Sequence, residues 1–265
     1  MALVIWLLFW APAYLCHVFL ALVYLLAAYE WSAFLYESDS WWRLAYVIGM
    51  GILALLSALL PVTLIMGIGV GWWLFGSFLV YCYPVLRTWW STQLGLGIMS
   101  VFILLPFYMG LSWLYQSDWS SAAILFVLLI VWSADIGAFF SGRYFGQHAL
   151  AKMISPNKTW EGVAGGVLLA VAVSAVGLSL WRQPGAWSMV AGLILLVMVI
   201  LTALISVIGD LIESMVKRHR GVKDSGNLIP GHGGILDRID ALTAAVPCFV
   251  LMFWYAQQHI ILLSN

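Results

Sequence analysis

Long apolar runs, separated by short polar segments, extend over almost the whole chain. A helix needs ~20 predominantly apolar residues to cross the ~30 Å hydrocarbon core of a bilayer, and most of the runs approach or exceed that length. The runs lack the strict alternation of apolar and polar residues that a transmembrane β-barrel requires. The pattern therefore predicts an all-α, polytopic membrane bundle of eight helices, or nine if Pro12 divides the first run. The expected spans are 1–28, 41–60, 62–81, 94–115, 120–140, 160–180, 186–208 and 241–263.

Composition supports a membrane protein and argues against a water-soluble one. Apolar residues make up 64% of the chain and charged residues 8%, with a mean hydropathy of +1.03. Soluble proteins carry roughly 25% charged residues, which a surface exposed to water requires. The net charge is zero, so we expect no nucleic-acid partner. A cleaved signal peptide is a weak alternative for the N-terminus, because the first residues carry no positive charge.

We interpret residues 1–265 as a single membrane-embedded domain, since no internal repeat or low-complexity linker is visible. Glycines spaced four residues apart let helix backbones approach closely in lipid. This spacing occurs at Gly67 and Gly71 and again at Gly162 and Gly166, so we expect both pairs to lie at helix contacts.

Fifteen of the 22 charged side chains lie in two short stretches, 135–161 and 210–240. Two expected spans separate the basic residues of these stretches, so both stretches emerge on one side of the membrane. The connection between those spans carries only Arg182. Lysine and arginine accumulate in cytoplasmic loops, so the positive-inside rule places both stretches in the cytoplasm.

The first candidate for chemistry is the end of the span that precedes Gly209. If the helix continues, Asp210, Ser214 and Lys217 lie at i, i+4 and i+7 on one face, with Glu213 beside them. A carboxylate, a hydroxyl and an ammonium would then line one stripe at the membrane boundary. An ordinary solvated helix end is the alternative for this segment alone.

The residues that follow form a glycine-rich turn and a second acidic cluster. Gly231, Gly233 and Gly234 surround His232, which suits positive φ angles and a close approach to a ligand. Asp237 and Asp240 share a face if the last helix has begun. Carboxylates without cysteine or clustered histidine suit Mg²⁺ rather than zinc. Anchoring to anionic lipid would explain the basic residues 217–223 but not the interleaved aspartates.

The other polar stretch begins within an apolar span, at Asp135. A carboxylate inside a membrane span is costly and is a functional candidate by default. Further on, Pro156 and Asn157 favour a turn, and Thr159 resembles a helix start. Lys158 beside a helix N-terminus would form a phosphate-binding site. Simple helix capping next to a surface lysine is the competing interpretation.

Together these residues form a long spaced pattern, which reads Ser214-x-x-Lys217-Arg218-x-x-x-x-Lys223-Asp224-x-x-x-x-x-Pro230-Gly231-His232-Gly233-Gly234-x-x-Asp237-Arg238-x-Asp240. It resembles, position for position, the signature of the phosphatidate cytidylyltransferases, also called CDP-diacylglycerol synthases. Residues 155–162 and 134–146 also resemble this family. The resemblance is dense over about 106–247, which suggests N-terminal helices in 1–105 and a catalytic half in 106–265. Two departures are Ile136, where bacterial members often have Ser or Thr, and Arg43 as the first basic residue.

The resemblance implies that CTP and phosphatidic acid react to give CDP-diacylglycerol and pyrophosphate, with Mg²⁺ as cofactor. It also implies an integral protein of the bacterial inner membrane with its active site facing the cytoplasm, and we expect a homodimer. We assign Asp210 and Asp237 as the first metal ligands, followed by Asp240 and Asp224. The residues expected to act in catalysis are Asp210, Lys217, Asp237 and Arg238. Those expected to bind the substrates are Asp135, Asn157, Lys158, Ser214, Arg218, Lys223, Asp224, His232, Gly233 and Gly234.

Two other functions remain open from the sequence. The related CTP-dependent polyprenol and phytol kinases transfer the γ-phosphoryl group and release CDP, but usually lack the full signature. A transporter could use Asp135 and Asp210 as coupling carboxylates. Its expected discontinuous segments in matching halves are absent, because the polar residues concentrate in the C-terminal half.

Overall fold

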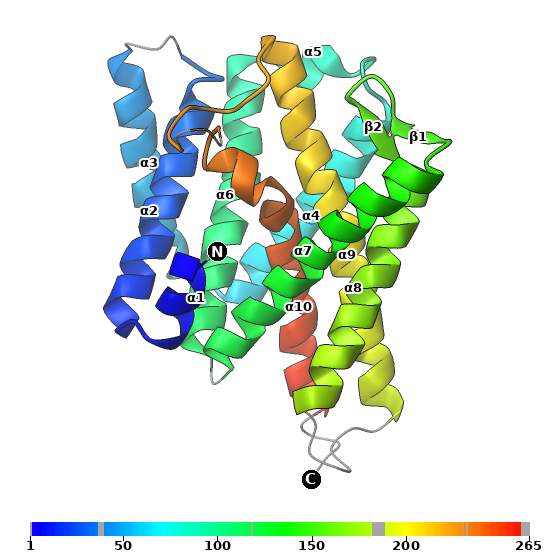
Figure 1. The fold of residues 1–265 in the computed structure, drawn as a ribbon. Helices are drawn as coiled ribbons and strands as arrows, with labels where there is room; N and C mark the ends of the chain where they lie inside the picture. Colours follow the sequence, from blue (N-terminus) through cyan, green and yellow to red (C-terminus); the bar gives the residue numbers. More distant parts are fainter. Residues whose placement is uncertain are drawn as a thin grey trace.

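In the computed structural model, the chain is a bundle of long helices with one small hairpin at one end (Figure 1). The structure describes residues 2–36, 40–117, 119–181, 189–229, 231 and 233–260. The long helices are α2 (Ala13–Ser32), α3 (Trp41–Ser57), α4 (Val62–Tyr81), α6 (Gln93–Gln116), α7 (Ser120–Phe145), α8 (Trp160–Trp181), α9 (Met189–Arg220) and α10 (Leu236–Ile260). The short elements are α1 (Ala2–Phe9), α5 (Arg87–Trp90), β1 (Ala149–Ala151) and β2 (Ser155–Thr159).

The predicted all-α membrane bundle is confirmed. Over the described ranges, seven helices are long and apolar enough to cross a membrane, and α3 is a shorter apolar helix. Pro12 does divide the first apolar run, at the start of α2, but α1 has only eight residues and is too short to span. Large apolar side chains on the outer surface, such as Leu55, Leu74 and Leu168, are exposed as lipid-facing residues would be.

Helix α10 lies in the middle of the bundle, where it packs against α9, α6 and α4 (Figure 1). Its side chains Val246, Phe249 and Val250 are fully buried, as are Met66 of α4 and Leu104 of α6. The N-terminal helices α2 and α3 lie on one side of this centre, and α7 and α8 pack together on the other. The first turn of α10 is therefore held among helices from both ends of the chain.

Close backbone contacts occur at some of the predicted glycines but not at others. A Cβ on Gly166 of α8 would lie 2.6 Å from the carbonyl oxygen of Ala134 on α7, so this predicted contact is confirmed. Gly67 and Gly71 of α4 have open space, so that prediction is wrong. Gly69 is the contact residue instead, because a Cβ there would lie 2.8 Å from Pro106 of α6. Helical periodicity turns the residue between the pair toward the neighbouring helix.

The segment before α8 also differs from its prediction. Pro156 and Asn157 lie in β2, which pairs antiparallel with β1 in the register Ala149 to Thr159 and Ala151 to Ser155. The turn falls at residues 152–154 instead. A two-stranded hairpin has only edge strands, and these tolerate proline. The hairpin ends directly at the start of α8, which places Lys158 next to the helix N-terminus as expected.

Candidate active site

The two polar stretches, predicted to emerge on one side of the membrane, meet at one end of the bundle. Lys158, from β2, places its Nζ 2.5 Å from Oδ2 of Asp210, on α9. Helix α9 continues through the polar segment to Arg220, so Asp210 and Ser214 lie on one face as predicted. The hydroxyl of Ser214 donates a hydrogen bond to Oδ1 of Asp210 at 3.2 Å. Asp210 therefore has a cation on one oxygen and a hydroxyl on the other.

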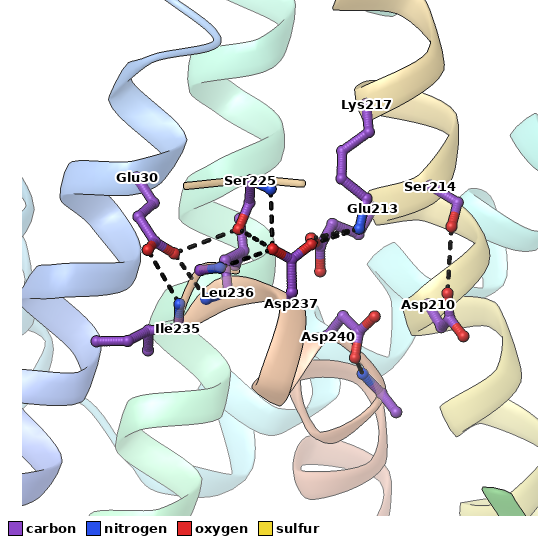
Figure 2. Close-up of polar contacts among 12 residues, drawn as sticks. Glu30, Asp210, Glu213, Ser214, Lys217, Ser225, Ile235, Leu236, Asp237 and Asp240 are labelled. Atoms are coloured by element: carbon purple, nitrogen blue, oxygen red, sulfur yellow. Dashed lines mark hydrogen bonds and ion pairs between the residues drawn. The ribbon is translucent and has the colours of Figure 1, made fainter. Parts of the chain in front are cut away.

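One turn further along α9, Lys217 joins two carboxylates. Its Nζ lies 2.6 Å from Oδ1 of Asp237 and 3.0 Å from Oε1 of Glu213 (Figure 2). The side chains of Lys217, Glu213 and Asp237 are 12%, 4% and 9% exposed, so water screens this contact weakly. Removing the lysine would leave two carboxylates close together in a buried position.

Asp237 also organises the backbone that leads into α10. Its Oδ2 accepts hydrogen bonds at 2.9 Å from the backbone N–H of Gly234 and from both the N–H and the hydroxyl of Ser225. Both N–H groups lie in the loop before α10, and a carboxylate in the first turn of a helix is favoured by the helix dipole. Asp237 thus fixes the loop and the helix start, while its other oxygen contacts Lys217.

Two further aspartates belong to the same charged cluster. Asp240, one turn into α10, accepts a hydrogen bond from the N–H of Ala241 at 2.8 Å. Its carboxylate is repelled by Asp210 and attracted by Lys217 and Lys158. Asp135, on α7, interacts with Asp210 and Lys158. Three helices and the hairpin therefore contribute acidic and basic groups to one region.

The glycine-rich loop between α9 and α10 has the backbone geometry that the sequence predicts. Gly231 and Gly233 have φ angles of 74° and 80°, which side-chain-bearing residues rarely adopt. The predicted site residue His232, and Pro230 of the signature, lie outside the described residues. The predicted site residues Asn157, Arg218, Lys223, Asp224 and Arg238 are exposed, and their roles stay predictions.

A cavity of about 430 Å³ opens beside this loop. Its lining includes Phe34 after α2, His219 and Arg220 at the end of α9, and Asp224 and Ser225 of the loop. Ser225 joins the cavity to the charged cluster, because its hydroxyl donates to Asp237.

Comparison with known proteins decides the family. The sequence profile of the cytidylyltransferase family matches residues 1–256. The chain belongs to the cytidylyltransferase family. It is 40% identical to the phosphatidate cytidylyltransferase of Pseudomonas aeruginosa over 243 residues, which is 90% of this chain and 87% of the relative. It is 42% identical to the Haemophilus influenzae protein of the same name over 194 residues, 70% of this chain and 67% of the relative.

This cytidylyltransferase-family site also contains a residue, Glu30, that the sequence motifs do not include. Glu30, near the end of α2, is 2% exposed and accepts hydrogen bonds from the start of α10 (Figure 2). The available signal was a single carboxylate at the end of an otherwise uncharged apolar run, which is a functional candidate on energetic grounds. The hydrogen-bond partners of Glu30 could not be predicted from the sequence pattern, because they lie about 200 residues away along the chain.

Proposed function

We propose that this protein is a phosphatidate cytidylyltransferase, as the names of its relatives suggest. A phosphate oxygen of phosphatidic acid would attack the α-phosphorus of CTP and form a new P–O bond. The bond from that phosphorus to the bridging oxygen would break, which releases pyrophosphate and leaves CDP-diacylglycerol. The observation that carries this proposal is the convergence of two lysine–aspartate pairs, Lys158–Asp210 and Lys217–Asp237, at one end of the bundle.

The arrangement suits transfer between two phosphate-bearing substrates. The attacking lipid phosphate is already anionic, so the reaction needs positioning and charge neutralisation more than a general base. Lys158 and Lys217 would exchange part of their contact with carboxylates for phosphate oxygens. The cavity beside Arg220 and Ser225 is large enough to receive the nucleoside part of CTP, and it adjoins the charged cluster.

We propose that Mg²⁺ is the cofactor and that Asp210 and Asp240 are its first ligands. Over the described ranges, no three acidic, histidine or cysteine side chains are grouped as a complete metal site. Proteins commonly hold Mg²⁺ through one or two carboxylates while substrate phosphates supply further oxygens, so the proposal needs only these two aspartates. When bound, the ion would neutralise charge on the phosphates. Asp237, also predicted as a ligand, already accepts four hydrogen bonds, so we propose that it supports the start of α10 and that Asp210 and Asp240 bind the ion.

The bilayer supplies one substrate and the aqueous phase the other. Phosphatidic acid would enter sideways between the helices, and CTP would enter from the cytoplasm, where the positive-inside rule places the basic residues. We therefore propose the bacterial inner membrane as the location, in keeping with the bacterial relatives. Homodimer formation also stays a prediction, which cross-linking in native membranes can test.

The deciding experiment uses purified protein in detergent with phosphatidic acid and CTP, with and without Mg²⁺, and identifies both products. We expect CDP-diacylglycerol and pyrophosphate, formed only when Mg²⁺ is present. Release of CDP would instead indicate γ-phosphoryl transfer, as in the polyprenol and phytol kinases. Solute flux across liposomes without nucleotide turnover would indicate a transporter.

A further inference from the structure

Glu30 connects the N-terminal part of the chain to the first turn of α10. It is the first charged residue of the sequence, and only 2% of its surface is exposed. Its Oε1 accepts a hydrogen bond from the N–H of Ile235 at 3.0 Å, and its Oε2 accepts one from the N–H of Leu236 at 2.8 Å. Figure 2 shows both bonds reaching from α2 to the start of α10.

Two glycines of the α9–α10 loop make room for this carboxylate. A Cβ on Gly226 would lie 2.6 Å from Oε1 of Glu30, and a Cβ on Gly234 would lie 2.6 Å from Oε2. Real Cβ atoms essentially never come so close to a neighbouring atom. The loop therefore passes on both sides of the Glu30 carboxylate at a distance that only glycine permits.

Glu30 is also linked to the charged cluster through one hydroxyl. Ser225 Oγ lies 3.3 Å from Oε2 of Glu30 and 2.9 Å from Oδ2 of Asp237, so one hydroxyl bridges the two carboxylates. Asp237 in turn contacts Lys217. A shift of Glu30 would consequently move the helix turn that carries Asp237 and, one turn later, Asp240.

We propose that Glu30 is a positioning residue for cytidylyl transfer, which holds the first turn of α10 and the bridging Ser225 in their reactive arrangement. The inference rests on the proposed function and extends it, because it gives the N-terminal helices a part in catalysis. The physical reason is that the N–H groups at the start of a helix need acceptors. At α10 a charged acceptor comes from a distant helix, and hydrogen bonds to charged acceptors are stronger than those between neutral groups.

The test compares Glu30→Gln with Tyr24→Phe as a matched control. Tyr24 is on the same helix, is also 2% exposed and donates a buried hydrogen bond to the carbonyl of Met50 on α3 at 3.0 Å. Both variants lose a buried polar contact, but only Glu30→Gln alters the start of α10. We expect kcat per folded molecule to fall by about 100-fold in Glu30→Gln, since small misplacements of reacting groups cost about that much. Tyr24→Phe should keep the parent kcat.

The second measurement is hydrogen exchange of the amides of Ile235 and Leu236, followed by mass spectrometry without substrates. Exchange should be faster in Glu30→Gln and unchanged in Tyr24→Phe. Faster exchange with an unchanged kcat would mean that Glu30 only supports the fold, and a lower kcat without faster exchange would mean that it acts elsewhere. Either result overturns the inference. If the parent makes no CDP-diacylglycerol, the proposed function fails, whereas the exchange data still decide whether Glu30 holds this helix turn.

Two more variants keep the test decisive if Glu30→Gln does not fold. Glu30→Asp retains the charge on a shorter side chain, so its kcat should lie between those of the parent and the glutamine variant. Ser225→Ala removes the bridging hydroxyl, which belongs to a loop residue, and should also lower kcat. A parent-level kcat in Ser225→Ala and Glu30→Asp together would overturn the proposal.

Discussion

Lys158 of β2 and Asp210 of α9 are in direct contact, with Nζ 2.5 Å from Oδ2, although the whole of α8 lies between them in the sequence. The contact joins the hairpin to the polar end of α9. It also brings a positive charge beside Asp210. The Lys158 ammonium attracts the nearby carboxylates of Asp135 and Asp240 as well, whereas Asp210 repels them. Phosphate groups that enter this region would meet a cation already held in place.

We expect Lys158→Ala to lower kcat/KM by about 100-fold, a typical cost of removing one group that stabilises transition-state charge. The measurement is steady-state formation of CDP-diacylglycerol with CTP and phosphatidic acid varied in turn. Lys152, exposed in the turn of the same hairpin, provides the control. An equal loss in Lys152→Ala would point to disturbance of the hairpin and would count against a specific role for Lys158.

Asp240→Asn and Asp237→Asn should separate metal binding from support of the helix start. We expect Asp240→Asn to raise the Mg²⁺ concentration needed for half-maximal activity, because it removes a carboxylate proposed to bind the ion. Asp237→Asn should lower activity and melting temperature with the Mg²⁺ requirement unchanged, since its carboxylate contacts Lys217, Ser225 and Gly234. Mg²⁺ titrations of both variants check this. A raised Mg²⁺ requirement in Asp237→Asn would instead support the sequence-based prediction that Asp237 binds the ion.

Lys217→Ala should weaken the use of CTP and also destabilise the protein. The lysine contacts both Glu213 and Asp237 in a buried position, and breaking one side of a buried ion pair costs about 3–5 kcal/mol. Melting in detergent and the apparent KM for CTP are the measurements. Arg218→Ala is the neighbouring control for the melting temperature only, because Arg218 is exposed. An unchanged melting temperature in Lys217→Ala would contradict the ion-pair argument.

Gly166→Ala should destabilise the α7–α8 pair, because its Cβ would lie 2.6 Å from the carbonyl oxygen of Ala134. Gly177→Ala, on the same helix, is the matched control, since nothing lies within 4 Å of the Cβ position there. Alanine is the better helix former, so Gly177→Ala should be neutral or slightly stabilising. The melting temperature should therefore fall in Gly166→Ala and stay unchanged or rise slightly in Gly177→Ala, and equal shifts would refute the close contact.

Much of the candidate site could be predicted because its signals are local. The i, i+4 and i+7 spacing of Asp210, Ser214 and Lys217 needs only a continuous helix, and α9 does continue through them. The positive φ angles at Gly231 and Gly233 follow from residue type. The position of Lys158 beside the start of α8 could also be predicted. The turn expected at Pro156 was wrong, because this residue lies in strand β2.

The sequence by itself determined the membrane bundle, its spans and the family signature, because span length and residue spacing are properties of neighbouring residues. Only the tertiary structure decided that Gly69 rather than Gly67 meets another helix, and that Asp237 supports the start of α10. Only it revealed Glu30 as the acceptor for that helix. The physical reason is that helical periodicity defines which residues share a face, whereas the partner of that face depends on how distant helices pack.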